Sequence, residues 1–204
     1  MESEQADTKK MRMMHDYNAT SSFYDFRYKQ DQFNKLKKIF SRKRQLKSPI
    51  LDFGGGTGLF LDYLVELDDE SVFDIHPLPE IGNHYVNCDL SQEMLKIMNS
   101  KPSIDMISEV LSVHAVCGDC EHLPFREYIF NSFISLTSIQ NFPDPESALK
   151  ELYRTTTPRA EGFLSTLNKK ISKEEFVKLI SNVFKSSRII AGDFGEDFAA
   201  NLKK

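Results

Sequence analysis

The sequence lacks the features that mark secreted and membrane proteins. Its 204 residues include three cysteines, Cys88, Cys117 and Cys120, too few for the disulfide framework of a small secreted domain. No apolar run approaches the length of a membrane span. The first fourteen residues contain three acids and no apolar centre, unlike a secretory signal. We therefore expect a cytoplasmic protein in a reducing compartment, without a membrane segment.

Basic residues are in the minority too. Lys and Arg number 26 against 30 Asp and Glu, so the formal net charge is −4, which argues against a large basic face for nucleic acid. Basic residues gather between Lys35 and Lys47. We interpret residues 41–48 as a solvated linker and helix end, with a small patch facing an anionic substrate as the alternative, and we place Lys35 on the outer face of the helix before them. The length favours one domain with a real core.

Glycine is scarce, with nine in the chain, yet four of the nine lie between residues 54 and 58. The stretch I-L-D-F-G-G-G-T-G-L-F at residues 50–60 predicts a strand, a tight turn and a helix. Glycine suits a backbone that turns with positive φ or that a ligand approaches closely, and a helix start offers N–H groups. Gly54, Gly56 and Gly58 are spaced G-x-G-x-G, which differs from the dinucleotide fingerprint G-x-G-x-x-G.

Two more acids follow predicted strands. Asp89 ends a strand over 84–89, and Ser91 is placed to cap the next helix. A carboxylate at this place can accept both vicinal hydroxyls of a ribose. Asp74 has the more usual spacing from the glycines and is the rival ribose ligand. Asp119 follows a strand that we expect to end near Cys117.

Together these stretches resemble the signature motifs of the class I, Rossmann-like S-adenosylmethionine-dependent methyltransferases, in the small-molecule or type 11-like branch. The stretches are D-F-G-G-G-T-G, N-C-D-L-S-Q-E-M-L and G-D-C-E-H-L-P-F. The resemblance covers residues 50–204 and implies an enzyme that binds S-adenosylmethionine, releases S-adenosylhomocysteine and methylates an unidentified acceptor by in-line displacement. It also favours Asp89 over Asp74 for the ribose, because only Asp89 has the D-L-S-x-x-M-L context.

The resemblance implies roles for individual residues in donor binding. The glycines would face the methionine and ribose, and Asp52 would orient their loop and, through it or water, the donor's amino group. Asp119 and the backbone of Cys120 would hold the adenine, and Leu136 would line the pocket. The implied cofactor-binding residues are Asp52, Gly54, Gly55, Gly56, Gly58, Asp89, Leu90, Asp119, Cys120 and Leu136.

No catalytic residue is assigned, because methyl transfer needs a general base only where the acceptor holds a proton of high pKa. We expect Tyr24 and Tyr28 to cover the donor as a lid, and Gln140 and Asn141 to orient the acceptor; the alternative role for all four is packing. The acceptor, whether small molecule, protein or tRNA, stays open.

Other interpretations of the same sequence remain. The chain could be a catalytically silent donor-binding subunit, or an enzyme that needs a small zinc-ribbon activator to act on tRNA or protein. A nucleotide-sugar or nicotinamide enzyme is a third alternative. His114, Cys117, Cys120 and His122 are all zinc-ligand types, and C-x-x-C occurs in redox pairs. We expect no metal, because neighbouring strand residues point to opposite faces, and we interpret Cys117 as a small core residue.

The alternation of strand and helix patterns predicts an α/β fold: a doubly wound, mostly parallel seven-stranded sheet. Residues 188–191 and 197–202 are expected to form a closing antiparallel hairpin, and residues 158–162 a turn. We divide the chain into a mobile tail (1–14), a helical, aromatic lid segment (15–48) and the S-adenosylmethionine-binding domain (49–204). Ser21 or Ser22 is expected to cap a short helix in the lid segment.

Overall fold

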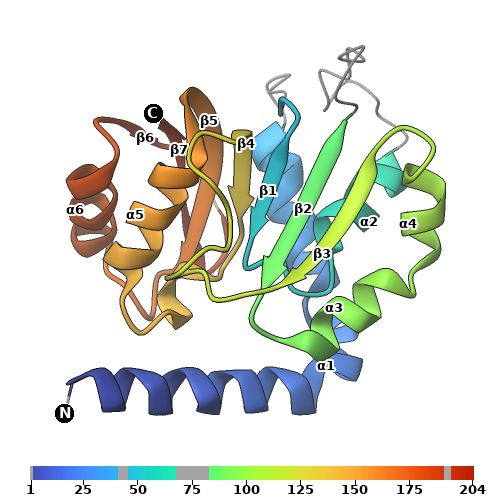
Figure 1. Cartoon of the computed structure of the whole chain (residues 1–204), viewed down its shortest axis with the longest axis horizontal. Helices are drawn as coiled ribbons and strands as arrows, with labels where there is room; N and C mark the ends of the chain where they lie inside the picture. The colour runs from blue at the N-terminus through green and yellow to red at the C-terminus, as the bar shows by residue number, and fades with distance from the viewer. Residues whose placement is uncertain (1, 41–45, 68–82, 191–193) are drawn as a thin grey trace.

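A twisted sheet forms the centre of the molecule (Figure 1). The computed structural model describes residues 2–40, 46–67, 83–190 and 194–204; Asp74 lies outside them. The strands are β1 (Ile50–Phe53), β2 (His84–Asp89), β3 (Ser112–Cys117), β4 (Phe130–Ser135), β5 (Thr156–Leu167), β6 (Ser186–Ile189) and β7 (Asp197–Lys203). Their order is β3-β2-β1-β4-β5-β7-β6, and β7 runs antiparallel to both of its neighbours. The predicted fold class and the closing hairpin are confirmed.

Helices cover both faces of the sheet. They are α1 (Glu2–Phe40), α2 (Leu59–Leu67), α3 (Gln92–Asn99), α4 (Pro102–Ile107), α5 (Pro145–Thr155) and α6 (Lys173–Val183), with a 3-10 turn η2 (Ile139–Asn141). Successive strand residues face opposite cores, as the pleat requires. Ile50 packs with α1 and α2, whereas Leu51 packs with α5 and α6. The carboxyl ends of the parallel strands meet at one edge of the sheet.

Helix α1 crosses that edge before it packs behind the sheet (Figure 1). We expected residues 1–14 to have no regular structure and Ser21 or Ser22 to cap a short helix; both expectations are wrong for the described residues, because one helix runs from Glu2 to Phe40. Residues 2–40 contain no glycine or proline and many strong helix formers. The Ser21 hydroxyl donates to the Asn18 backbone carbonyl (3.0 Å) inside this helix.

Strand β5 is longer than predicted. Residues 158–162, expected to form a turn, lie within it. Phe130 pairs with Thr156 while Ser132 pairs with Glu161, so the register shifts by several residues between these two points. Such an irregularity accommodates Pro158, which cannot donate to a regular ladder.

The predicted helix cap at Ser91 is confirmed. The Ser91 hydroxyl accepts from the Met94 N–H (3.2 Å) at the start of α3. Ser172 and Glu175 form a reciprocal capping box at the start of α6. Among the residues described, no helix combines the length and apolarity that a membrane crossing requires.

Candidate functional site

The glycine turn connects β1 to the neighbouring strand and loop. Gly54 has a φ of +71° and Gly56 a φ of +54°, values that residues with a Cβ rarely adopt. The Gly54 N–H donates to the Cys88 carbonyl near the end of β2 (2.8 Å). A Cβ added to Gly54 would lie 2.9 Å from the Cβ of Ser138. The backbone therefore passes between β2 and the loop after β4 with no space for a larger residue.

Asp89 is held by the backbone on both sides. Its Oδ2 accepts from the Gly56 N–H (2.9 Å) and its Oδ1 from the Ser91 N–H (2.8 Å). Burial raises the pKa of the Asp89 carboxyl, while these two hydrogen bonds oppose the rise. A carboxylate has about four acceptor sites. Two therefore remain for a ligand in the cavity that Asp89 lines.

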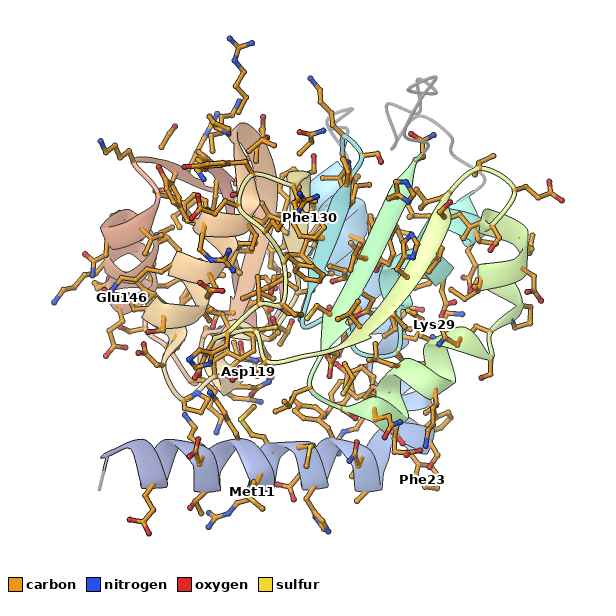
Figure 2. The ribbon with its side chains drawn as sticks, viewed as in Figure 1. Met11, Phe23, Lys29, Asp119, Phe130 and Glu146 are labelled. Atoms are coloured by element: carbon orange, nitrogen blue, oxygen red, sulfur yellow. The ribbon has the colours of Figure 1, made fainter. Side chains whose placement is uncertain are left out.

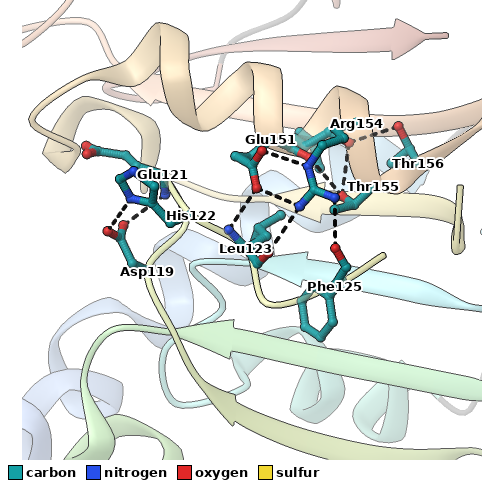
Figure 3. Close-up of polar contacts among 10 residues, drawn as sticks. Asp119, Glu121, His122, Leu123, Phe125, Glu151, Arg154, Thr155 and Thr156 are labelled. Atoms are coloured by element: carbon teal, nitrogen blue, oxygen red, sulfur yellow. Dashed lines mark hydrogen bonds and ion pairs between the residues drawn. The ribbon is translucent and has the colours of Figure 1, made fainter. Parts of the chain in front are cut away.

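The segment after β3 is anchored by α5 (Figure 3). Arg154 donates to the carbonyls of Phe125 (2.9 Å) and Leu123 (3.1 Å). Its ion-pair partner Glu151 (2.7 Å) accepts from the Leu123 N–H (2.9 Å). Hydrogen bonding to Arg154 holds the pKa of Glu151 below its usual range. These contacts fix the L-P-F part of the third motif and thereby the position of Asp119, at its other end.

The three motifs surround one space, which we call the central cavity, at the carboxyl ends of the strands. Its volume is about 700 Å³, its mouth included. Nine of the fourteen predicted site residues line it. They are Tyr24, Gly54, Gly56, Asp89, Leu90, Asp119, Cys120, Leu136 and Asn141. Separate parts of the sequence thus converge on one cavity at the carboxyl ends of the strands.

The other five predicted residues lie elsewhere. Asp52 and Gly55 border a small cavity of about 380 Å³, its open part included, beside the central one. Tyr28 and Gln140 border an outer cavity of about 1400 Å³, measured in the same way. Gly58 faces Met98, whose Cγ would lie 2.6 Å from an added Cβ. Gly58 therefore serves close packing of α3 against the turn.

Helix α1 covers the central cavity with residues that the sequence analysis missed. Lys10, Met13, Met14 and Tyr17 line the cavity together with Tyr24. Figure 2 shows Asp119 between the sheet and α1, with Met11 on the far side of the helix. The spacing of the lining residues is that of one helix face. This signal was present in the sequence, but treating residues 1–14 as a tail concealed it.

Polar contacts fix α1 over the cavity. Lys10 Nζ lies 2.8 Å from Asp119 Oδ2 and 2.5 Å from Glu121 Oε2. Hydrogen bonds from Lys10 and His122 lower the pKa of Asp119 despite its partial burial. The Asn141 amide donates to the Tyr17 hydroxyl (2.7 Å). The first half of α1 is therefore tied to two of the loops that form the cavity.

Replacing Lys10 with methionine should loosen the first half of α1 without unfolding the sheet. The substitution removes the cation that faces two carboxylates. Amide hydrogen exchange at residues 7–20 should accelerate about tenfold, because local opening then breaks fewer charged hydrogen bonds. Exchange in β1 and β4 should not change. Arg12→Met, on the exposed face of α1, is the matched control; equal acceleration in both variants would contradict the role assigned to Lys10.

The outer cavity adjoins the central one. Tyr17, Tyr24, Thr137 and Asn141 line both. The ring centroids of Tyr17 and Tyr24 are 6.3 Å apart, and those of Tyr24 and Tyr28 are 4.8 Å apart. The two cavities therefore meet at a row of tyrosines from α1.

A buried polar cluster lies where the cavities meet. Thr137, a non-glycine residue with a φ of +56°, donates its hydroxyl proton to Asp197 Oδ2 (2.7 Å) and accepts from Lys35 Nζ (2.8 Å). Lys35 Nζ also lies 2.8 Å from Asp197 Oδ1, and the Ser165 hydroxyl donates to Oδ2 (2.8 Å). Lys35, expected on a solvated face, is 7% exposed. Backbone in this sparsely populated region is typical of functional sites.

Asp52 lies beneath the glycine turn. It is 4% exposed and accepts a hydrogen bond from the Tyr85 hydroxyl. Burial raises the pKa of Asp52 to about 7, although the Tyr85 hydrogen bond opposes this. A Cβ on Gly55 would lie 2.4 Å from Asp52 Cγ. Gly55 is therefore required for the approach of Asp52 rather than for lining the central cavity.

The four zinc-type residues have separate surroundings. His114 Nε2 lies 3.1 Å from His84 Nδ1, and His122 Nδ1 lies 3.0 Å from Asp119 Oδ2. Cys120 is buried, whereas Cys117 is exposed on the edge strand β3, so its interpretation as a core residue is wrong. Within residues 2–40, 46–67, 83–190 and 194–204, no group of three or more His, Cys, Asp or Glu is placed to hold a metal ion.

Comparisons with known proteins agree with this geometry. A family model described as a methyltransferase domain matches residues 51–164, more than half of the chain. The ubiquinone/menaquinone biosynthesis C-methyltransferase UbiE of Wigglesworthia glossinidia brevipalpis is 25% identical over 151 residues, covering 71% of this chain and 54% of that protein. The chain spans about half, or less, of the length of the curated relatives it matches.

Solved structures share the fold. Magnesium protoporphyrin IX methyltransferase from Synechocystis PCC 6803, with bound S-adenosylhomocysteine, has a TM-score of 0.67 at 11% identity and covers 96% of this chain and 99% of its own. A chain of the complex between the Haloferax volcanii Trm112 methyltransferase activator and a methyltransferase has a TM-score of 0.63 at 15% identity, covering 92% of this chain and 96% of its own. The chain therefore belongs to the Rossmann-like S-adenosylmethionine-dependent methyltransferases, in the type 11 branch.

Proposed function

We propose that the chain binds S-adenosylmethionine in the central cavity and transfers its methyl group to an acceptor in the outer cavity. The observation that supports this most is the convergence of Gly54, Gly56, Asp89 and Asp119 on one cavity at the carboxyl ends of the strands. Ligands of open α/β sheets bind at that edge. The proposal makes Asp89 the ribose ligand and places the adenine beside Asp119 and Cys120.

The chemistry of the cavity fits this donor. The glycine turn lets a ligand approach the backbone, and Asp89 keeps two acceptor sites for vicinal hydroxyls. Methionines Met13, Met14 and Met94 add polarizable apolar surface for an aromatic base. A solved neighbour of the same fold holds S-adenosylhomocysteine, the demethylated donor. Donor specificity would come mainly from these groups.

The donor, when bound, supplies an electrophilic methyl group on a sulfonium. The residues of this chain would align the acceptor with it and exclude water, which suits a reaction whose charge disperses in the transition state. Tyr24 and α1 would provide the cover, as the lid that we expected. Asn141, which lines both cavities, is placed to orient the acceptor; Tyr28 and Gln140 reach it only in the outer cavity.

The tyrosines between the cavities are neutral hydrogen-bonding groups. Burial raises the pKa of Tyr17 to about 12, and burial raises the pKa of Tyr24 as well. Phenols with raised pKa values do not act as bases near neutral pH. We therefore assign them to positioning, and we assign no catalytic base.

For the acceptor we propose a small ring-bearing molecule. Tyr17, Tyr24, Tyr28 and Phe194 are among the residues that line the outer cavity, and aromatic side chains bind planar ligands. The related UbiE protein is a C-methyltransferase of ubiquinone and menaquinone biosynthesis, which supports the same class. A screen of phenols, quinols, peptides and tRNA with labelled methyl donor tests it. Methylation of only peptide or tRNA would contradict the proposal.

Asp89→Ala should weaken S-adenosylmethionine binding about 100-fold, because two hydrogen bonds to a charged group are lost. Calorimetric titration of the protein and the variant measures this, with NAD as the control ligand. Asp105→Ala, an exposed acid of α4, is the control variant. Loss of binding in Asp74→Ala but not in Asp89→Ala would keep the function and contradict the ribose assignment.

An activator subunit is a further proposal, supported by the solved complex with Trm112. Strand β3 is one of the two edge strands of the sheet, where a partner could add. Its exposed residues are Ser112, His114, Ala115 and Cys117, none of them large and apolar. Co-expression with a zinc-ribbon activator should raise solubility and activity if a partner is needed; full activity of the chain alone would contradict this.

A further inference from the structure

Helix α1 places one ammonium group in the wall of the outer cavity. Lys35 lines this cavity together with Thr137 and Asp197, and its side chain is 9% exposed. An ammonium group has three N–H donors. Two of them are used by Thr137 Oγ1 and Asp197 Oδ1, each 2.8 Å from Lys35 Nζ. Within the described part of the chain the third N–H has no acceptor, so it is available to a ligand in this cavity.

The neighbours of Lys35 hold this ammonium group in place. Thr137, which has a φ of +56°, accepts from Lys35 and donates to Asp197 Oδ2 (2.7 Å). The same carboxylate oxygen accepts from the Ser165 hydroxyl (2.8 Å), and the Gln32 amide donates to Thr137 Oγ1 (3.4 Å). The cluster therefore joins α1 to the loop after β4, to β5 and to the start of β7. A donor fixed in this way needs little reorganisation when it meets a negative charge.

Lys35 lies where the outer cavity adjoins the central one. Thr137, its hydrogen-bond partner, lines both cavities, as do Tyr24 and Asn141. A planar ring against the tyrosines of α1 could therefore place one substituent at Lys35 and still face the donor that we propose for the central cavity.

The charges around the outer cavity favour an anion. Its described lining includes four basic residues, Arg27, Lys35, Lys38 and Lys169, and three acidic ones, Asp31, Glu196 and Asp197. This lining therefore has a net charge of +1, whereas the whole chain has a formal net charge of −4. Lys35 is buried and the other three basic residues are exposed, so water screens the charge of Lys35 least. Lys35 is thus the cation of this lining that would act most strongly on a bound ligand.

We propose that Lys35 binds a hydroxyl oxygen of the ring-bearing acceptor in its ionised form, so that the outer cavity selects rings with an acidic hydroxyl. This inference rests on the proposed function. On binding, the O–H bond of the acceptor breaks, its electron pair stays on the oxygen and the proton goes to solvent, because a nearby cation favours the charged form. The negative charge spreads into the ring and makes it a stronger nucleophile. The protein then needs no base for this step.

Two nitro-substituted rings test this role, with the protein held in excess S-adenosylhomocysteine. 4-Nitrophenol ionises near neutral pH to a coloured anion, whereas 4-nitroanisole has the same ring and cannot ionise. Spectroscopic titration across pH should show that the unmodified protein binds the anion about 10- to 100-fold more tightly than the neutral phenol, the effect of one hydrogen bond to a charged group. Binding of 4-nitroanisole reports on the cavity without the charge.

Lys35→Met combined with Asp197→Asn removes the ammonium group, leaves no buried charge unpaired and keeps the net charge of the cavity. The preference for the anion should fall below about threefold, while 4-nitroanisole binding should change less than about twofold. Lys35→Gln combined with Asp197→Asn, which keeps an N–H donor toward Thr137, is measured beside it in case the first variant does not fold.

Lys38→Met provides the matched control. Lys38 lines the same cavity, with its Nζ 5.9 Å from the centroid of the Phe194 ring, and its loss lowers the cavity charge while Lys35 stays in place. The preference for the anion should change less than about threefold.

Three results would overturn the assignment of Lys35. They are an anion preference that survives in the double variants, an equal loss of that preference in Lys38→Met, and a parallel loss of 4-nitroanisole binding in the double variants, which would make the role of Lys35 structural. Failure of the unmodified protein to bind either ring would instead overturn the outer cavity as the acceptor site. The failure of this inference and that of the proposed function are therefore distinguishable.

Discussion

Replacing Lys35 with methionine should lower the free energy of unfolding by about 3–5 kcal/mol, the cost of breaking a buried ion pair from one side. The side chains of Lys35 and Asp197 are 9% and 0% exposed, with 2.8 Å between Nζ and Oδ1. Asp197 Oδ1 makes no hydrogen bond within the described part of the chain apart from this pairing. The variant therefore leaves a buried carboxylate oxygen without any compensating charge or donor.

Urea unfolding measures the effect, because the midpoint shifts while the slope stays constant for a loss of stability alone. Lys37→Met, an exposed lysine of the same helix, should cost less than about 1 kcal/mol. The double variant Lys35→Met with Asp197→Asn should regain much of the loss, since asparagine has no charge and still accepts from Thr137 and Ser165. Equal costs for Lys35→Met and Lys37→Met would show that the pair is not buried in solution.

The second large effect concerns pH. The contribution of Asp52 to stability should fall by roughly 4 kcal/mol as the pH rises from about 4 to above about 7. Burial raises the pKa of Asp52 from 3.8 to about 7 in the folded protein. The folded state therefore keeps a proton that the unfolded chain has lost. This stabilisation is fully present at pH values below the pKa of Asp52 in the unfolded chain. It is lost as the pH rises through the pKa of Asp52 in the folded protein.

Asp52→Asn isolates this contribution. Asparagine still accepts from the Tyr85 hydroxyl but does not titrate. Between about pH 5 and about pH 8, the free energy of unfolding of the original protein should therefore fall by roughly 2–3 kcal/mol more than that of the variant. Other titrating groups cancel in the difference between the two proteins. Urea unfolding at both pH values gives the result. Parallel pH profiles for the two proteins would show that Asp52 has an ordinary pKa.

The sequence predicted the elements whose signals are local. The run of four glycines among five residues needs positive φ at Gly54 and Gly56, and the structure has it. Ser91 caps the helix that follows it, as its place in the sequence predicts. The structure places alternate strand residues, such as Ile50 and Leu51, in two separate cores. Nine predicted site residues share one cavity because carboxyl ends of parallel strands meet at one edge of a sheet.

The errors occurred where local signals were weak or were overridden. Residues 2–14 are mostly polar, yet they continue a helix that Lys10 and Tyr17 tie to distant loops. Pro158 resembles a turn residue in isolation, but an irregularity in the pairing with β4 keeps it in β5. In both cases the neighbouring elements, not the segment itself, determine the conformation.

By itself, then, the sequence determined the fold class, the turn at the end of β1 and the family of the chain, because each depends on residue types at fixed spacing. Tertiary structure alone decided what α1 does. Gln32 and Lys35 have the composition of an ordinary polar helix face, and their surroundings come from Thr137 and Asp197, more than a hundred residues away. Such a site depends on which distant elements pack together, and burial then makes each unpaired polar group costly.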